Sequence, residues 1–187
     1  PGNGKRPPVW IITAGIALQS QLLNKDLPLA IKAASSTSGV SYGLLKGISN
    51  YVCPLMVAAH EQDPPSFNDD VLAERWVDLN TWIKDGGSDR GQLSHEPHGV
   101  LWSKVSCSPG ECLGKHCPMV KGCVGFNTRL ATRNADIIIT NYHTYGYYLK
   151  GGHLTSSEAA KVAPRIFIFD ECHEMEDVLQ NTLGYYI

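Results

Sequence analysis

The sequence predicts an α/β fold in which a mainly parallel, open sheet is interrupted by a helical, cysteine-rich insert. Three short apolar runs, at 9–13, 136–140 and 166–169, have the composition of buried parallel strands. A helical pattern follows each run, as expected when helices connect parallel strands. Four clustered cysteines lie between the first two runs. These observations place the insert at about residues 45–125.

Length and composition indicate a globular protein without a membrane-spanning segment. The chain has 187 residues, enough for one sizeable domain or for one domain with an insertion, and it is 43% apolar and 18% charged. No apolar run approaches the roughly 18 residues that a membrane helix needs, and the first residues do not resemble a signal peptide. We therefore expect a cytoplasmic, nucleoid-associated location and no membrane partner.

Charge is unevenly distributed along the chain. The formal net charge of −2 argues against a uniformly basic nucleic-acid-binding protein. Between residues 104 and 133, however, Glu111 is the only acidic residue among five basic ones: Lys104, Lys115, Lys121, Arg129 and Arg133. Such a patch suits a phosphate backbone, and a solvated surface loop would have the same composition.

Two helices are predicted from the spacing of apolar residues. One follows the first strand and runs over about 16–24. The other spans about 66–86, where one apolar stripe is formed by Leu72, Trp76, Leu79 and Ile83. We expect Ser66 or Asn68 to cap its start and the glycines at 86–87 to end it.

The first residues contain glycines and a lysine but no Walker A loop. That loop needs the pattern G-x-x-x-x-G-K-[ST] directly after a strand. In the segment at 2–5, Lys5 is followed by Arg6 and no strand precedes the glycines. No other stretch of the chain supplies the pattern.

The third predicted strand ends in Asp170, Glu171, Cys172 and His173. At the carboxyl end of a parallel strand, Asp170 could hold a hydrated Mg²⁺ and Glu171 could orient an attacking water, as in a Walker B strand. The same polar residues could instead cap the next helix, expected over 174–183. These residues alone do not decide between the two interpretations.

Six cysteines are unevenly spaced. Four lie in one segment, Cys107, Cys112, Cys117 and Cys123, whereas Cys53 lies upstream and Cys172 in the carboxylate motif. Without a signal peptide, such clustering favours a metal or iron–sulfur site over disulfides. The spacing matches neither the C-x-x-C pairs of most structural zinc sites nor the bacterial ferredoxin run, so the kind of metal stays open.

Polar and aromatic residues around the second strand have two interpretations each. Arg129 and Arg133 lie four residues apart on a predicted helix over 126–135, where they could clamp phosphates or face solvent. After the strand at 136–140, four tyrosines could stack on bases or fill the edge of a core: Tyr142, Tyr145, Tyr147 and Tyr148.

Four segments, in this order, resemble motifs of the DinG-like and XPD-like iron–sulfur helicases of superfamily 2. The segment ITAGIALQSQL at 12–22 resembles their motif Ia. The segment KGISNYVC at 46–53 resembles the residues that lead to their first cluster cysteine. The segment ADIIITNYH at 135–143 resembles their ADIVVTNHALL signature. The segment DECH at 170–173 resembles their DEAH box.

The chain departs from this family pattern at three positions. Ile48 stands where an arginine is common, which removes one potential contact to a nucleic-acid backbone. Tyr142 separates the asparagine and histidine of the signature, so the residue that faces DNA is left open. Cys172 stands where the DEAH box has alanine.

The resemblance implies a partial RecA-like domain with an iron–sulfur insert. Residues 1–44 would form the first part of helicase domain 1, residues 45–125 the insert, and residues 126–187 the return to domain 1 and the start of the following helical region. A [4Fe–4S] cluster would be held by Cys53, Cys112, Cys117 and Cys123. Cys107 would be a free thiol or a substitute for one of the four.

The resemblance also implies roles for single residues. Asp170 would hold Mg²⁺, Glu171 would activate water, and His173 would couple the nucleotide site to the nucleic acid. Contacts to single-stranded DNA would come from Thr13, Lys46, Arg129, Arg133 and Asn141.

The function implied is that of an ATP-dependent 5′→3′ DNA helicase acting on single-stranded DNA and single-strand/duplex junctions. The sequence contains neither a Walker A loop nor a second RecA-like domain, so we expect the chain alone not to hydrolyse ATP. The alternative is a zinc-binding, non-catalytic module that acts as a nucleic-acid or protein adaptor.

Overall fold

The computed structural model describes three stretches of the chain: 8–34, 39–151 and 166–184. The chain divides into two compact units. One combines Pro1–Lys46 with Ala131–Ile187, and the other is Gly47–Leu130, close to the insert expected at 45–125. The glycine–lysine segment at 2–5 lies outside the described residues.

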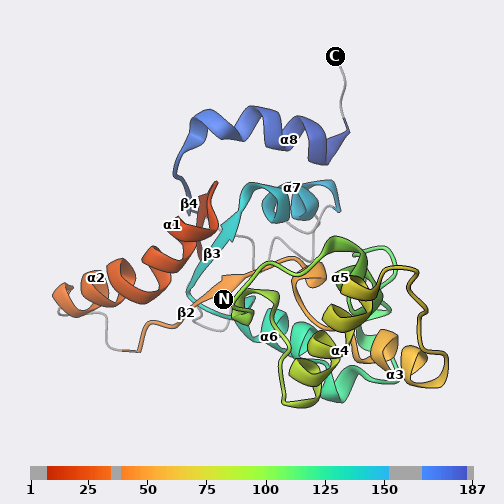
Figure 1. The fold of residues 1–187 in the computed structure, drawn as a ribbon. Coiled ribbons are helices and arrows are strands. Elements are labelled where there is room, and N and C mark those ends of the chain that lie inside the picture. Colours follow the sequence, from red (N-terminus) through yellow and green to blue (C-terminus); the bar gives the residue numbers. More distant parts are fainter. Residues whose placement is uncertain (1–7, 35–38, 152–165, 185–187) are drawn as a thin grey trace. The chain divides into compact units, whose positions relative to one another are not determined.

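The first unit contains a sheet of four parallel strands (Figure 1). The strands are β1 (Val9–Thr13), β2 (Tyr42–Leu45), β3 (Ile137–Asn141) and β4 (Ile166–Phe169). Their order in the sheet is β2-β3-β1-β4. The predicted α/β class with a parallel sheet is confirmed. The composition of β2 does not predict a strand, because it contains Gly43 and lacks β-branched residues.

The described helices of the first unit are α1 (Ile16–Gln21), α2 (Leu27–Ala33), α7 (Tyr142–Lys150) and α8 (Met175–Leu183). Three of them follow strand ends, as predicted, and the fourth, α2, continues from α1. A π-helical turn, Leu22–Asp26, joins α1 to α2, so the helical segment continues past the predicted end at residue 24. Pro28 is tolerated because it lies in the first turn of α2, directly after this wider turn.

Alternate residues of β1 and β3 pack on opposite sides of the sheet. On one side, Ile12 and Ile138 join a core with residues of α7. On the other side, Ile11 and Ile139 pack with Leu27 of α2. Because both sides are covered, these two strands consist almost wholly of apolar residues, which is why the sequence predicts them.

The tyrosines of α7 belong mainly to this core. Tyr142, Tyr145 and Tyr148 are buried, whereas Tyr147 is 39% exposed. Helix α8 approaches α7 closely at Gly146, where an added Cβ would lie 2.9 Å from Cγ2 of Thr182. The core-edge interpretation therefore holds for three of the four tyrosines.

The expectation that β4 is buried is wrong for the described structure. Ile166, Ile168 and Phe169 are 55%, 47% and 39% exposed. β4 is last in the strand order and pairs only with β1 among the described strands. Phe167 packs against the core around α7, and the partly exposed ring of Phe169 contacts Tyr142 and Tyr145 of that core. An edge position exposes residues whose composition would suit the middle of a sheet.

The second unit is mainly helical. Its helices are α3 (Pro54–Gln62), α4 (Asp70–Lys84), α5 (Gly99–Val105) and α6 (Val124–Thr132), the last of which crosses the boundary between the units. Short 3₁₀ turns lie at Ile48–Asn50, Arg90–Gln92, Gly114–His116 and Val120–Gly122. Within the described ranges, no helix is long and apolar enough to cross a membrane.

Helix α4 confirms the predicted apolar stripe but begins later than expected. Leu79 is buried in the core of the unit, and the other stripe residues pack against it. The cap is Asp69, whose carboxylate accepts hydrogen bonds from the backbone N–H groups of Val71 and Leu72. The predicted caps Ser66 and Asn68 are therefore wrong. A carboxylate at this position satisfies two N–H groups of the first turn.

Helix α6 ends earlier than the predicted helix over 126–135. Its last residue is Thr132, and a turn follows in which the N–H of Ala135 donates to the carbonyl of Thr132. Arg133 consequently lies outside the helix. It does not share a helical face with Arg129.

Candidate functional site

The carboxyl ends of three neighbouring strands bring predicted site residues together in the first unit. Thr13, the last residue of β1, pairs in register with Asn141, the last residue of β3. On the other side of β1, the backbone N–H of Asp170 donates a 2.8 Å hydrogen bond to the carbonyl of Ile12. The carboxyl-terminal end of the sheet therefore brings together Thr13, Asn141 and Asp170. In open parallel sheets, ligands bind at this end of the strands.

A buried tyrosine holds the backbone at Asp170. The phenolic hydroxyl of Tyr142 donates a 2.8 Å hydrogen bond to the Asp170 carbonyl, and its ring stacks on Phe169 at an interplanar angle of 6°. Burial raises the pKa of Tyr142, and the nearby Cys172, Asp170 and Glu171 raise it further. The phenol therefore stays protonated and able to donate. Tyr142 is a positioning residue, a role that the sequence does not predict.

Glu171 has an unusual backbone. Its φ of 56° is the only positive φ of a non-glycine residue in the described stretches. It separates β4 from the 3₁₀ turn Cys172–Glu174, and its Oε2 lies 3.4 Å from Nδ1 of His173. Both side chains are largely exposed, which leaves the carboxylate accessible to a ligand. Backbone strain of this kind is often found at functional sites.

The predicted DNA-binding residues at the ends of the strands differ in burial and in hydrogen bonding. Thr13 is completely buried, and its hydroxyl has no hydrogen-bond partner among the described residues. Asn141 caps α7 by accepting a 2.8 Å hydrogen bond from the N–H of Thr144. Lys46 is half-buried directly after β2. The DNA-binding roles of these residues stay predictions.

The two predicted phosphate-binding arginines belong to different units. Arg129 lies in α6 within the second unit, and its Nε atom is buried without a hydrogen-bond partner in the described part of the chain. Arg133 lies in the first unit, with its guanidinium 5.6 Å from the ring centre of Tyr148. Their predicted role in clamping phosphates stays a prediction.

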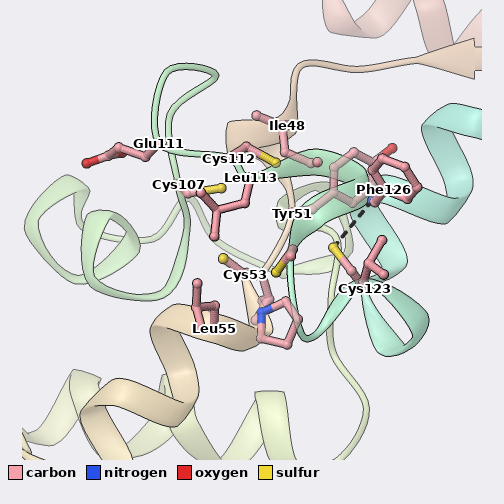
Figure 2. Close-up of a pocket in the computed structure, with 15 residues that line it drawn as sticks. Ile48, Tyr51, Cys53, Leu55, Cys107, Glu111, Cys112, Leu113, Cys123 and Phe126 are labelled. Carbon is pink, nitrogen blue, oxygen red and sulfur yellow. Dashed lines mark hydrogen bonds between the residues drawn. The ribbon is translucent and has the colours of Figure 1, made fainter.

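Five cysteines line one cavity of the second unit (Figure 2). They are Cys53, Cys107, Cys112, Cys117 and Cys123. The walls between them are mainly apolar and include Ile48, Val52, Leu55, Leu113 and Phe126. The free volume is about 30 Å³. The clustering of the cysteines along the sequence does not reveal that Cys107, which is outside the expected ligand set, shares the cavity with the other four.

Backbone hydrogen bonds bring the thiols to this cavity. The N–H of Cys53, just before α3, donates a 2.7 Å hydrogen bond to the carbonyl of Val105 at the end of α5. Cys107 follows two residues later. Cys112, Cys117 and Cys123 each donate from the backbone N–H to a residue three or four positions earlier. The loops are therefore a series of tight turns rather than extended segments.

Ile48 also contributes to this arrangement. It is only 3% exposed, and its Cδ1 would lie 3.0 Å from a Cβ added to Gly125. The position at which the family commonly has an arginine is here part of the cavity wall. The buried Ile48 side chain therefore does not offer a contact to a nucleic-acid backbone.

Burial holds the inner thiols in their neutral form. It raises the pKa of Cys107, and the neighbouring thiols of Cys53 and Cys112 raise it further. Burial also raises the pKa of Cys123. A 3.4 Å hydrogen bond from the N–H of Phe126 to its sulfur acts in the opposite direction and lowers that pKa. A bound cation would reverse this preference, because metals bind thiolates.

No group of three or more histidine, cysteine, aspartate or glutamate side chains among the described residues is placed to hold a single metal ion. The five thiols surround the cavity without converging on one point. Asp170 and Glu171, in the other unit, are likewise not part of such a group.

Sequence comparisons place these observations in a family context. The DEAD_2 family model matches residues 109–187. The chain is 30% identical to the ATP-dependent DNA helicase YoaA of Escherichia coli over 183 residues, which are 94% of this chain and 27% of YoaA. It is 30% identical to the ATP-dependent helicase DinG of Mycobacterium tuberculosis over 186 residues, which are 91% of this chain and 27% of that protein.

The resemblance to DinG-like helicases is thereby confirmed. A third relative, the ATP-dependent DNA helicase DinG of Escherichia coli, is 27% identical over 192 residues. That match covers 92% of this chain and 25% of the relative. The chain thus spans about a quarter of the length of each of these three helicases.

Proposed function

We propose that this chain is part of the motor of an ATP-dependent 5′→3′ DNA helicase and that its second unit holds a [4Fe–4S] cluster. The observation that carries the first part is the position of Asp170 and Glu171. They follow the parallel strand β4, at the same carboxyl-terminal end of the sheet as Thr13 of β1 and Asn141 of β3. The names of the relatives, all ATP-dependent helicases, support the same conclusion.

The chemistry proposed for this edge is ATP hydrolysis. The carboxylate of Asp170 would hold the Mg²⁺ that accompanies the nucleotide, and Glu171 would orient the attacking water. The hydrogen bond from Tyr142 to the Asp170 carbonyl would fix the backbone from which both carboxylates extend. His173, 3.4 Å from Glu171, would couple this site to the nucleic acid.

The donor set of the second unit fits an iron–sulfur cluster. Such clusters are bound by cysteine thiolates, one for each iron, so the four ligands surround the cluster instead of meeting at one ion. Five thiols with apolar residues between them meet this requirement.

We assign the four ligands to Cys53, Cys112, Cys117 and Cys123, with Cys107 as a fifth thiol in the same cavity. Four and five residues separate the last three ligands, as the resemblance implies. When bound, the cluster would brace this unit and supply an iron–sulfur redox centre. The cysteines would hold it as thiolates, and the apolar walls would limit the access of water.

The proposed partners are ATP, single-stranded DNA and single-strand/duplex junctions. The DNA contacts are assigned to Thr13, Lys46, Arg129, Arg133 and Asn141. An association with the nucleoid would follow from DNA binding.

Turnover by the complete helicase tests the assignment of Glu171. Glu171→Gln should lower DNA-stimulated ATP hydrolysis by at least about 100-fold, the usual contribution of a general base, while nucleotide binding is retained. Glu174→Gln, an exposed carboxylate in the same turn, is the matched control and should change turnover little. Equal effects of the two variants would contradict the assignment.

A further inference from the structure

Cys107 is the one thiol of the cavity that the proposed cluster does not use. It is 6% exposed and lines the cavity together with Cys53 and Cys112, whose thiols help to raise its pKa. Figure 2 shows the Cys107 and Cys112 side chains extending into the same cavity from one loop. The fifth thiol therefore lies in the same cavity as the proposed ligands, near Cys53 and Cys112.

A tight turn keeps Cys107 and Cys112 close. The N–H of Ser108 donates a 2.8 Å hydrogen bond to the carboxylate of Glu111. In return, the N–H groups of Glu111 and Cys112 both donate to the Ser108 carbonyl, at 3.1 Å each. The segment between the two cysteines thus folds back on itself.

We propose that Cys107 and Cys112 form a reversible disulfide when the cavity is exposed to a peroxide. Cys112 is half-buried and Cys107 is almost wholly buried, so the oxidant reaches Cys112 first. A thiol beside a more accessible cysteine is the arrangement of a resolving cysteine.

The reaction is balanced with hydrogen peroxide as the oxidant. The Cys112 thiol attacks one peroxide oxygen, which gives a sulfenic acid and one water. The Cys107 thiol then attacks the Cys112 sulfur, the S–O bond breaks, and the hydroxyl leaves as a second water with the proton of Cys107. Two electrons pass from the two sulfurs to the peroxide. A dithiol reductant reverses the step by thiol–disulfide exchange.

The disulfide would protect a cluster ligand from irreversible damage. Without a resolving thiol, sulfenic acid proceeds to sulfinic acid, which ordinary thiols do not reduce. With Cys107 present, reduction would return Cys112 to the thiol form that cluster assembly needs. This benefit rests on the proposed cluster, whereas the disulfide itself rests only on the positions of the two thiols.

Peptide mapping tests the disulfide directly. The full chain is reduced and treated with an equimolar amount of hydrogen peroxide, both as purified anaerobically and after removal of iron with a chelator. Free thiols are then blocked with N-ethylmaleimide, and the chain is cleaved with trypsin. The peptide 105–115 contains Cys107 and Cys112 and no other cysteine, while Cys53 falls in 47–75.

In the chelator-treated chain, most of peptide 105–115 should be unlabelled and lighter by two hydrogen atoms, and dithiothreitol should restore labelling. Cys107→Ser should abolish this product and increase sulfinic acid at Cys112. Cys172→Ser, the same substitution at an exposed cysteine, should leave the product unchanged. Full labelling of peptide 105–115 after oxidation, or a bridge to 47–75 in its place, would overturn the proposal.

Iron analysis of the purified chain separates this inference from the cluster. A disulfide in a chain that never contained iron would support the thiol pair and contradict the proposed cluster. Iron and sulfide in the purified chain, with no disulfide after chelation and oxidation, would support the cluster and contradict the thiol pair.

Discussion

The hydroxyl of Tyr142 and the carbonyl oxygen of Asp170 form a 2.8 Å hydrogen bond between the start of α7 and the end of β4. Tyr142 is only 1% exposed, and its neighbour Phe169 stacks on its ring. The bond connects the carboxylate motif after β4 to the first residue of α7, which follows β3. The tyrosine that interrupts the family signature therefore has a structural reason to be there.

Tyr142→Phe should loosen this tie while the ring packing is kept. Loss of the donor leaves the carbonyl unsatisfied, so the free energy of unfolding should fall by about 1 kcal/mol. In the complete helicase, ATP turnover should fall several-fold, because Asp170 and Glu171 would be less well positioned. Urea unfolding and a steady-state ATPase assay measure the two effects.

Tyr145→Phe makes the same chemical change in the same helix and serves as the control. The ring of Tyr145 packs edge-on against Phe167 and Phe169, and those contacts need no hydroxyl. Its turnover should therefore stay near that of the unmodified protein. A larger loss of turnover in Tyr145→Phe than in Tyr142→Phe would show that the hydrogen bond is unimportant.

Glu171→Gly should stabilise the fold and abolish turnover at the same time. A side chain at φ 56° costs about 1 kcal/mol relative to glycine, which adopts this conformation freely. Thermal unfolding should shift upward by the equivalent of about that energy, while ATP hydrolysis by the complete helicase is lost.

Glu174→Gly is the matched comparison, because Glu174 has a φ of −87° in the same turn. Removal of this carboxylate offers no relief of strain, so the substitution should be neutral or destabilising. If the two glycine variants had the same stability, the strain assigned to Glu171 would be refuted.

Tyr51 should make the stability of the second unit depend on alkaline pH. Burial, aided by Asp89, raises its pKa to about 12 from an ordinary value of 10.0. The folded state therefore keeps the phenolic proton over a range in which the unfolded state loses it. The contribution of Tyr51 is complete below pH 10 and is lost as the pH rises toward about 12.

The difference between the unmodified chain and Tyr51→Phe isolates this group. Between pH 9 and pH 12, the unmodified chain should lose about 1–3 kcal/mol more unfolding free energy than the variant. Urea unfolding monitored by circular dichroism over this range gives the comparison. Parallel pH profiles would mean that Tyr51 titrates normally in the folded chain.

The strands that are predictable from the sequence are mainly those covered on both faces. β1 and β3 contain apolar residues at nearly every position because both sides of the sheet bury them. β4 has the same composition yet lies at an edge, and strand order is a tertiary property that composition does not contain. β2 is not predicted, because Gly43 and the lack of β-branched residues give too weak a strand signal.

Local boundaries are less predictable, because several residues compete for one role. Ser66, Asn68 and Asp69 are all suitable caps, and in the structure it is the side chain of Asp69 that caps α4. Pro28 is typical of a helix end, but a π-helical turn places it at a tolerated position. Such choices depend on small local energies that the sequence pattern does not rank.

The candidate site is predictable in its composition but not in its geometry. The sequence identifies Asp170 and Glu171 by their position after an apolar run. It does not reveal the hydrogen bond from Tyr142, which joins residues 28 positions apart. Likewise, spacing alone reveals neither the turn between Ser108 and Glu111 nor the position of Cys107 in the cavity.

Metal analysis of the anaerobically purified chain tests the central claim most directly. Iron, acid-labile sulfide and zinc are measured together with the visible absorption spectrum. We expect about four irons and four sulfides per chain and a broad absorption in the blue, as for a [4Fe–4S] cluster bound by four cysteines. One zinc per chain, with no iron and no visible absorption, would contradict the cluster and favour the zinc-binding adaptor.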